Sequence, residues 1–317
     1  MPHGTRSIGS HPVMQRPENE LRPFDLLVIG ITMGSIALSA CGQSDDGEGE
    51  VHARVATAAF AGSPAHDVAA SAPLLSMRDR ASFRRLAKQL GGKSALTVSA
   101  VGRRQPAERL GDLDDVTAWS TIKVPIAVAV IQQNGARRDR QLLRAAITMS
   151  SNDAAEQLWS RLGPPRVAGR KVEGVLAAAG DRTTRVQIRH VRQGFTSFGQ
   201  TRWPLAAQHR FIAGLQCVSK GRQVLGLMAD VVPSQRWGLG STGLPARFKG
   251  GWGPGLSGRY LVRQMGILEL PNGRSLAVSA ATVAADGGFP SATRNLTRMA
   301  RWLRRHVNGA AVPPAAC

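Results

Sequence analysis

A long block of helical sequence interrupts the strand-like segments of this chain, and this arrangement constrains the fold more than any other feature. From Trp119 to about Asp230, five segments have apolar residues at helical spacing, separated by Gly, Pro and polar turns. Before the block, residues 94–102 alternate and end in Gly, as a strand does. After the block, three segments have strand character: ARFKGGW, GRYLVRQMGILEL and RSLAVSAATVA. Strands on both sides of a helical block predict one sheet with a helical insertion.

Two basic amphipathic segments frame these strands. Residues 77–90 have apolar positions at helical spacing with Arg on the other face, and the Gly pair at 91–92 ends the pattern. Residues 291–307 form a similar basic helix near the end of the chain. We therefore predict an α/β (α+β) fold, an antiparallel sheet flanked by N- and C-terminal helices with an inserted all-helical subdomain. The predicted domain, 77–317, has a sheet part at 77–118 and 237–310 and a helical part at 119–236.

The charge balance favours anionic partners. The chain has 41 Lys and Arg against 21 Asp and Glu, a formal net charge of +20, and only six of the cations are lysines. Such a surface suits nucleic acid, anionic lipid or an acidic cell-wall polymer, although biased codon usage also produces Arg-rich chains. No stretch combines a basic run with interleaved aromatics, and a single Tyr leaves few stacking platforms. Nucleic acid is therefore not expected as a partner.

The N-terminal region has the layout of an export signal. Residues 24–40 form an apolar run that follows Arg16 and Arg22 and ends in small residues directly before Cys41. The Leu-Ser-Ala-Cys sequence ending at Cys41 resembles the bacterial lipobox, which implies lipidation of Cys41 and cleavage before it. A membrane-spanning helix is the alternative, for which the run is slightly short. We expect a lipoprotein signal peptide at 1–40, a flexible tether at 41–76, and anchoring to the outer face of the cytoplasmic membrane.

The two remaining cysteines suggest a disulfide rather than a metal site. In an exported, oxidising setting two leftover cysteines often form a disulfide, which here would link Cys217 and Cys317. Cys217 could equally be a buried small hydrophobe, and Cys317 could be a free thiol. With 317 residues, 43% of them hydrophobic, the chain can bury a core without a stapled scaffold. No metal-ligand spacing occurs among the seven histidines or the cysteines, so we expect neither a metal nor another cofactor.

Three short motifs carry candidate chemistry. Ser120 and Lys123 are three residues apart and share one face of a predicted helix, and no other lysine has Ser three positions before it. Residues 150–152 are the only Ser-x-Asn, at a joint between two helical segments, and 249–251 are the only Lys-x-Gly, on a predicted strand. Taken singly, these would be a helix cap, a turn and a solvated lysine. Together, they place hydroxyl, amine and amide groups on helix, turn and strand in a fixed order.

That order resembles the serine β-lactamases and penicillin-binding proteins, whose signatures are S-x-x-K, S-D-N and K-T-G. The class A β-lactamases are the most similar group, because residues 145–155 (AAITMSSNDAA) match their pattern around the second motif nearly residue for residue. The resemblance extends from about Met77 to Val307. It implies the β-lactamase/transpeptidase-like fold and an acyl-enzyme formed with a β-lactam, a peptidoglycan stem peptide or a related ester or amide.

The resemblance also implies roles for individual residues. Ser120 would be the nucleophile, Lys123 its base, and Ser150 would relay a proton to the leaving nitrogen. A buried Lys123 near the cationic Lys249 would have a lowered pKa, as a base acting near neutral pH needs. The backbone N–H groups of Ser120 and Trp252 would form the oxyanion hole. Substrate binding would fall to Asn152, Lys249, Gly251 and Trp252.

Three departures from the family pattern change what the site is expected to do. Ser151 replaces the Asp of S-D-N, which affects the rigidity of the loop more than its chemistry. Gly250 replaces the Thr of K-T-G and removes a hydroxyl that binds the β-lactam carboxylate. The interval from Ser120 to Ser150 is about half the class A length and lacks a segment that walls one side of the pocket. We therefore expect a more open site.

The largest departure concerns the water that releases the acyl group. Class A enzymes use a Glu on the loop before the helix that we assign to 204–219, and this chain has no Glu between 173 and 269. Gln200 or His190 of the long surface loop at 181–203 could orient a water, but neither matches the family position. We therefore expect slow deacylation. The alternative is a catalytically silent lipoprotein that uses the same fold to bind cell wall or a protein partner.

Overall fold

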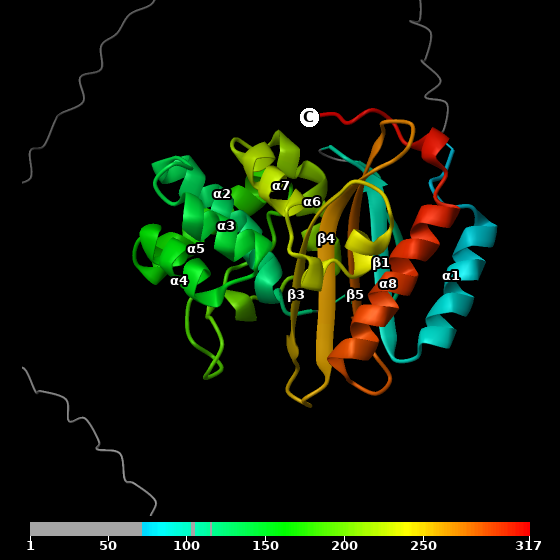
Figure 1. Ribbon diagram of the computed structural model, residues 1–317, viewed down its shortest axis with the longest axis horizontal. Coiled ribbons are helices and arrows are strands. Elements are labelled where there is room, and N and C mark those ends of the chain that lie inside the picture. Colours follow the sequence, from blue (N-terminus) through cyan, green and yellow to red (C-terminus); the bar gives the residue numbers. More distant parts are fainter. Residues whose placement is uncertain (1–71, 103–104, 115) are drawn as a thin grey trace, which may run out of the picture. The chain divides into compact units, whose positions relative to one another are not determined.

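The sheet and its helices are described by a computed structural model over residues 72–102, 105–114 and 116–317. The predicted signal peptide, Cys41 and the tether up to residue 71 lie outside these residues. Within them, no helix is long and apolar enough to cross a membrane. Five strands form one antiparallel sheet in the order β2-β1-β5-β4-β3 (Figure 1). Their bounds are Lys93–Ala100 for β1, Glu108–Gly111 for β2, Ala246–Pro254 for β3, Tyr260–Glu269 for β4 and Ser275–Val283 for β5.

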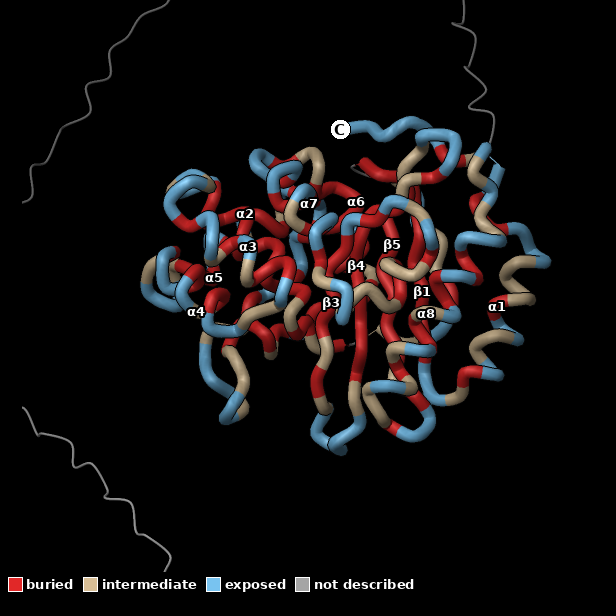
Figure 2. Tube along the Cα trace, in the orientation of Figure 1, coloured by how far each residue is buried: buried red, intermediate tan, exposed pale blue. Residues whose placement is uncertain are grey.

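In the middle of the sheet, a strand from before the helical block pairs with a strand from after it. β1 pairs with β5, so that Leu96 lies opposite Ala280, and β5 follows β4 through the predicted Pro-Asn-Gly turn. Both β4 and β5 are buried along most of their length (Figure 2). The helical block is therefore inserted between strands of one sheet, which confirms the predicted fold class.

The two faces of the sheet are covered by different helices. Val98 and Val278 point to the face that α1 (Met77–Leu90) and α8 (Phe289–His306) cover, and they share a cluster with Phe83 and Trp302. Because side chains alternate along a strand, neighbouring residues such as Ala277 point to the other face, which α6 (Leu205–Gly214) covers. The sheet thus separates α1 and α8 from the helical part (Figure 1).

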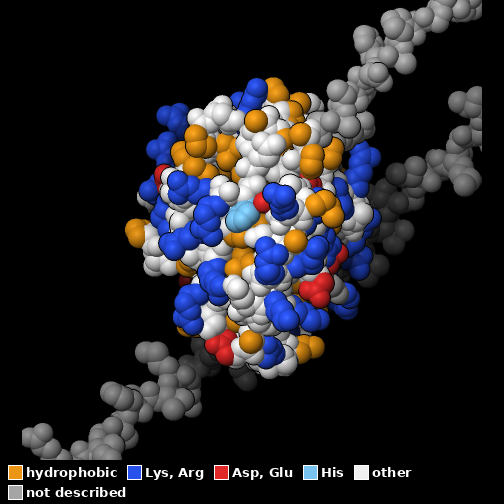
Figure 3. Space-filling model, turned by 90° about the vertical axis from the view of Figure 1, so that its right-hand side faces the viewer, with side chains coloured by type: hydrophobic (Ala, Val, Ile, Leu, Met, Phe, Trp, Pro, Cys, Tyr) orange, Lys and Arg blue, Asp and Glu red, His pale blue; other side chains and the backbone are white. Residues whose placement is uncertain are grey.

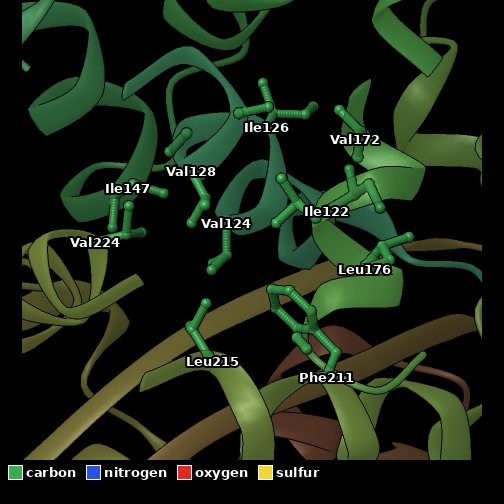
Figure 4. Packing of buried hydrophobic residues seen from close by; sticks show 14 of the residues in the cluster. Ile122, Val124, Ile126, Val128, Ile147, Val172, Leu176, Phe211, Leu215 and Val224 are labelled. Atoms are coloured by element: carbon green, nitrogen blue, oxygen red, sulfur yellow. The ribbon is translucent and has the colours of Figure 1, made fainter. Parts of the chain in front are cut away.

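Helix α2 (Lys123–Asn134) forms the centre of the helical part. Every residue from Lys123 to Ile131 is buried, as expected of a helix that is apolar on all sides. Figure 4 shows Ile122, Val124, Ile126 and Val128 packed among side chains of the surrounding helices. Lys123 therefore begins a helix whose surroundings are almost wholly hydrophobic. The helices around α2 are α3 (Arg140–Thr148), α4 (Asn152–Arg161), α5 (Pro165–Ala178) and α7 (Gly221–Ala229).

Two elements differ from the sequence prediction. The predicted helix at 204–219 is shorter, because α6 ends at Gly214, where an added Cβ would lie 2.2 Å from the carbonyl oxygen of Ala179. A separate helix, α7, then starts after Lys220, whose φ of 67° breaks the helical path. The edge strand β2 was also not predicted, since its four residues are too few for an alternating pattern.

A disulfide links Cys217 and Cys317 across a sequence separation of 100 residues, with the two Cα atoms 5.3 Å apart. This confirms the pairing that the sequence left open. Beside the disulfide, Ala316 forms a parallel bridge with Gly102 at the end of β1. The disulfide therefore fastens the end of the chain to the segment after α6, and the Ala316 bridge holds it beside Gly102, two residues after β1.

Candidate active site

Ser120 lies on η1 (Trp119–Ile122), a short 3₁₀ helix that leads directly into α2. Its side chain caps no helix and has no hydrogen-bond partner among the described residues. Strand β3 lies close against this turn, since a Cβ on Gly251 would be 3.0 Å from the backbone nitrogen of Ser120 and 2.9 Å from the carbonyl oxygen of Ala118. Glycine at 251 thus permits the close approach, and the hydroxyl of Ser120 remains free to react.

Lys123 is not a solvated lysine. Its side chain is 1% exposed, and its Nζ donates hydrogen bonds to the carbonyl oxygen of Ser150 at 2.6 Å and to Oδ1 of Asn152 at 2.7 Å. Burial lowers the pKa of Lys123 to about 7, while the charges of Glu156 and Asp153 oppose this effect. About half of the amine is therefore neutral near pH 7.

Lys249 is buried more completely, at 0% exposure. Its Nζ donates hydrogen bonds to Oγ of Ser150 at 2.8 Å and to the carbonyl oxygen of Gly250 at 2.9 Å. Burial, and then the charge of Lys123, hold the pKa of Lys249 well below its ordinary value. The repulsion between the two lysines thus lowers the pKa of Lys249, whereas the lowered pKa of Lys123 is due to burial rather than to the charge of Lys249.

Ser150 is held between the two lysines. Lys123 binds its carbonyl oxygen and Lys249 binds its hydroxyl, while its φ of 62° lies in the left-handed region that non-glycine residues rarely adopt. The next residue, Ser151, caps α4 by accepting a hydrogen bond from the backbone nitrogen of Ala154 at 3.2 Å. Ser151 therefore secures the turn by a local contact.

A small cavity of about 110 Å³ lies beside Ser120. Ligand pockets usually enclose roughly 300–1,000 Å³. This cavity is therefore small, because three aromatic side chains narrow it, while the openness of the site relative to class A enzymes stays a prediction. Among the predicted site residues, the cavity is lined by Ser120, Lys123, Asn152 and Trp252. The remaining lining residues are Trp119, Phe195, Thr196, Gly199 and Gln200.

The loop at 181–203 is fastened over this cavity. Arg192 donates a hydrogen bond to the carbonyl oxygen of Pro254 at 2.8 Å, at the end of β3. Its guanidinium carbon lies 4.5 Å from the ring centre of Phe195, whose ring meets the ring of Trp119 edge-on at 5.3 Å. Arg192 and Phe195 thus close the cavity from the loop side.

Of the two loop residues considered for orienting a water, only Gln200 reaches the cavity. Its amide nitrogen Nε2 is buried and has no hydrogen-bond partner among the described residues. His190 does not line the cavity, and its Nδ1 lies 3.3 Å from the carbonyl oxygen of Phe195. Gln200 therefore offers an unused amide group near Ser120.

Glu156 is a neighbour of the site that the sequence reasoning missed. It lies on α4 four residues after Asn152, so both side chains share one face of the helix. Burial raises the pKa of Glu156, and the charges of His190 and Lys123 oppose this effect. The i to i+4 spacing from Asn152 is the signal that would have identified this carboxyl group.

Gly250, which replaces the Thr of K-T-G, lies against the side chain of Trp237. A Cβ on Gly250 would lie 3.0 Å from the indole ring of Trp237, so this ring fills the space beside the glycine. Lys249, predicted to attract a substrate carboxylate, does not line the cavity and contacts Ser150 instead. Gly250 thus supplies no hydroxyl for a carboxylate, and the expected role of Lys249 in attracting one stays a prediction.

Comparison with known proteins identifies the architecture. No family model matches the sequence, and no curated protein matches it. Solved structures do: a β-lactamase from Chitinophaga pinensis is 15% identical with a TM-score of 0.59, covering 72% of this chain and 98% of that chain. The chain has the class A β-lactamase fold. A β-lactamase from Xanthomonas campestris (18% identity, TM-score 0.56, 72% and 97% covered) and a class A β-lactamase from Mycobacterium abscessus (17%, 0.53, 72% and 98%) are similar as well.

Within this β-lactamase fold, the geometry suits Lys123 as a proton acceptor. A neutral amine has two N–H groups and one lone pair. The two hydrogen bonds of Lys123, to Ser150 and Asn152, use both N–H groups and leave the lone pair for a proton. With a pKa of about 7, the amine can accept that proton near neutral pH.

Proposed function

We propose that this protein is a β-lactamase-like serine hydrolase that forms an acyl-enzyme at Ser120. The observation that carries the proposal is the buried Lys123, whose pKa of about 7 and two donated hydrogen bonds leave a basic lone pair beside an unbonded serine hydroxyl. The substrates would be β-lactams, peptidoglycan-derived peptides or related esters and amides.

In the proposed reaction, Lys123 takes the hydroxyl proton as Oγ of Ser120 attacks the substrate carbonyl carbon. The bond from that carbon to its nitrogen or ester oxygen then breaks. The Ser150 hydroxyl, held by Lys249 at 2.8 Å, gives its proton to the leaving atom, and the proton taken by Lys123 replaces it. The acyl group remains as an ester on Ser120.

Hydrolysis of that ester is proposed to be slow. The cavity lining contains no carboxylate, and the amide of Gln200 can orient a water but cannot take its proton. Glu156 lies on the same helix face as Asn152 but does not line the cavity. The protein would therefore trap an acyl group rather than turn over rapidly.

The cavity size favours small acyl groups. About 110 Å³ is well below the roughly 300–1,000 Å³ of usual ligand pockets, so a bulky β-lactam side chain would have to lie outside this cavity or displace the loop that carries Phe195. The filled space beside Gly250 also favours substrates without a carboxylate at that position. We infer small activated esters or amides as the best substrates.

The proposed location is the outer face of the cytoplasmic membrane, with the protein held by a lipid on Cys41. This part of the proposal is supported by the sequence of residues 24–41 alone. Mass spectrometry of the protein purified from membranes tests it, because a lipidated N-terminal cysteine at 41 is expected. Recovery of a soluble chain that retains residues 1–40 would contradict it.

Intact-protein mass spectrometry after incubation with penicillins, cephalosporins and small activated esters tests the proposed activity. We expect one added acyl group, and no adduct in Ser120→Ala. The matched control is Ser257→Ala, which changes an exposed serine in the β3–β4 turn. This variant should be acylated like the unmodified protein. The absence of any adduct, or an adduct that persists in Ser120→Ala, would refute the proposal.

The second candidate is a silent binding protein with the same fold. It is favoured by one observation, the absence of a hydrogen bond between Ser120 and Lys123 among the described residues. This candidate predicts salt-sensitive sedimentation with purified peptidoglycan that Ser120→Ala does not change. It also predicts no acyl adduct with any of the reagents above.

A further inference from the structure

Helices α1 and α8 enclose a groove of about 380 Å³ on the face of the sheet opposite the helical part. Arg85 of α1 and Arg298, Arg301 and Arg305 of α8 line it, together with Ser82 and Gln89 of α1. Figure 3 looks onto this side of the molecule and shows many Lys and Arg side chains with few acidic ones among them. The groove thus gathers four guanidinium groups around one concave surface.

The arginines follow the axis of the groove. On α8 the basic residues recur at steps of four, three and four, which places them on one face over about 16 Å of helix. They are Arg294, Arg298, Arg301 and Arg305. On α1 the same spacing carries polar or basic residues, Arg78, Ser82, Arg85 and Gln89. Three residues of each row line the groove, Arg298, Arg301 and Arg305 on α8 and Ser82, Arg85 and Gln89 on α1, so a stripe of hydrogen-bond donors runs along each helix.

Carboxylates do not neutralise these stripes. The two helices contain ten Lys and Arg and a single acidic residue, Asp79, whose side chain is used in the capping box with Ser76. Among the described residues, none of the four arginines of the groove pairs with a carboxylate. Arg298 instead donates to Oε1 of Gln89 at 3.3 Å. Repulsion between these cations favours a bound anion.

The floor of the groove is held rigid. Nε1 of Trp302 donates a hydrogen bond to Oγ of Ser82 at 3.1 Å, which connects α8 to α1. The ring of His306 stacks on Trp302 at 4.6 Å, and its Nδ1 donates to the carbonyl oxygen of Trp302 at 2.8 Å. The two stripes are thus fixed relative to each other before any ligand binds, which lowers the entropic cost of binding.

We propose that this groove binds a linear phosphodiester polymer without aromatic bases, such as a polyol-phosphate chain. Guanidinium groups match phosphate geometry in pairs, and their linear array along the groove suits an extended polyanion more than a flat membrane surface. The indole of Trp302 and the ring of Phe83 are not open for base stacking, since these residues are 3% and 1% exposed, and the ring of His306 already stacks on Trp302. The proposal is independent of acylation at Ser120.

The test compares two triple variants that lose the same charge. One variant removes three positive charges from the groove: Arg298→Gln, Arg301→Gln and Arg305→Gln. The other removes three positive charges from exposed residues near the start of α3: Arg137→Gln, Arg138→Gln and Arg140→Gln. Binding of labelled inorganic polyphosphate is measured by fluorescence anisotropy across a salt series. The groove variant should bind at least about thirty-fold more weakly, with a salt slope lower by roughly two. Equal losses in both variants would overturn the proposal.

Two further experiments determine which polyanion the groove binds and whether the loss of binding is due to misfolding of the variant. Arg298→Lys, Arg301→Lys and Arg305→Lys keep the charge but lose the paired guanidinium geometry, so this variant should bind polyphosphate more tightly than the Gln variant and less tightly than the unmodified protein. Poly(glycerol phosphate) should compete with the labelled probe. Groove-dependent binding that is tighter for single-stranded DNA, or that occurs only with anionic phospholipid vesicles, would overturn the assignment. Ser120→Ala should bind polyphosphate normally, so the result of this binding test does not depend on the result of the acylation test.

Discussion

Lys249 donates a hydrogen bond from Nζ to Oγ of Ser150 at 2.8 Å, although the two residues are 99 positions apart in the chain. Lys123 holds the carbonyl oxygen of the same serine. One residue of the α3–α4 turn therefore connects the strand lysine with the helix lysine, and its left-handed backbone is stabilised from both sides. This contact is the physical link among the three motifs.

The pH dependence of acylation should report the pKa of Lys123. Because the neutral amine is the base, the rate of adduct formation should rise as the pH increases through about 7. Replacement by Met should slow acylation by roughly 10²- to 10⁴-fold. Adduct formation followed by mass spectrometry over this pH range measures both effects. A rate that falls as the pH rises through 7 would contradict the role of Lys123.

Lys123 should also make stability depend on pH. Its pKa is lowered from 10.5 to about 7 in the folded state, so the unfolded state binds more protons between these values. Stability should therefore increase with pH from about 7 to about 10. Urea unfolding at several pH values measures this slope, which should be smaller in Lys123→Met. An unchanged slope in that variant would show that the folded pKa is not lowered.

Gln200→Glu should shorten the life of the acyl-enzyme. The substitution places a carboxylate in the cavity beside Ser120, where it can take a proton from water. We expect release of the adduct to be at least about tenfold faster. The decay of the adduct mass after removal of excess reagent gives the rate. Gln193→Glu, at an exposed position of the same loop, is the matched control and should have no effect.

Gly251→Ala should abolish acylation. Its Cβ would come within 3.0 Å of the Ser120 nitrogen and 2.9 Å of the Ala118 carbonyl oxygen, so η1 must shift away from β3. Such overpacking costs about 1–3 kcal/mol in stability. Gly255→Ala, whose Cβ would meet only an ordinary contact at 3.5 Å, should behave like the unmodified protein. Normal acylation by Gly251→Ala would show that this close approach is unimportant.

Loss of the disulfide should affect stability and leave acylation unchanged. Cys317→Ser removes a link that closes a loop of about 100 residues, and such removals cost roughly 2–5 kcal/mol. Urea unfolding of the oxidised protein and of the variant measures the difference. The disulfide lies beside Gly102 rather than beside Ser120. An acylation rate that fell with stability would contradict the separation of these regions.

The sequence predicted the parts of the fold and site that depend on local pattern. Strand alternation and helical spacing identified the sheet with its helical insertion, because these periods follow directly from which side chains face the core. The uniqueness of the three motifs pointed to Ser120, Lys123, Ser150 and Lys249, and the structure brings these residues together.

Features set by packing between distant segments were not predictable in the same way. Phe195 and Gln200 enter the cavity because Arg192 fastens their loop to the end of β3, a contact over 62 positions that no local pattern encodes. The indole of Trp237 fills the space beside Gly250 for a similar reason. Only Glu156 carried a local signal, its spacing from Asn152, and it was overlooked.

Peptide mapping of the protein after reaction with a small activated ester tests the central claim most directly. The account predicts that the acyl group is found on the peptide that contains Ser120, as an ester cleaved by hydroxylamine. It also predicts that the same peptide from Lys123→Met carries little or none of it after the same time. An acyl group found on the amine of Lys123, or on surface residues alone, would contradict the account.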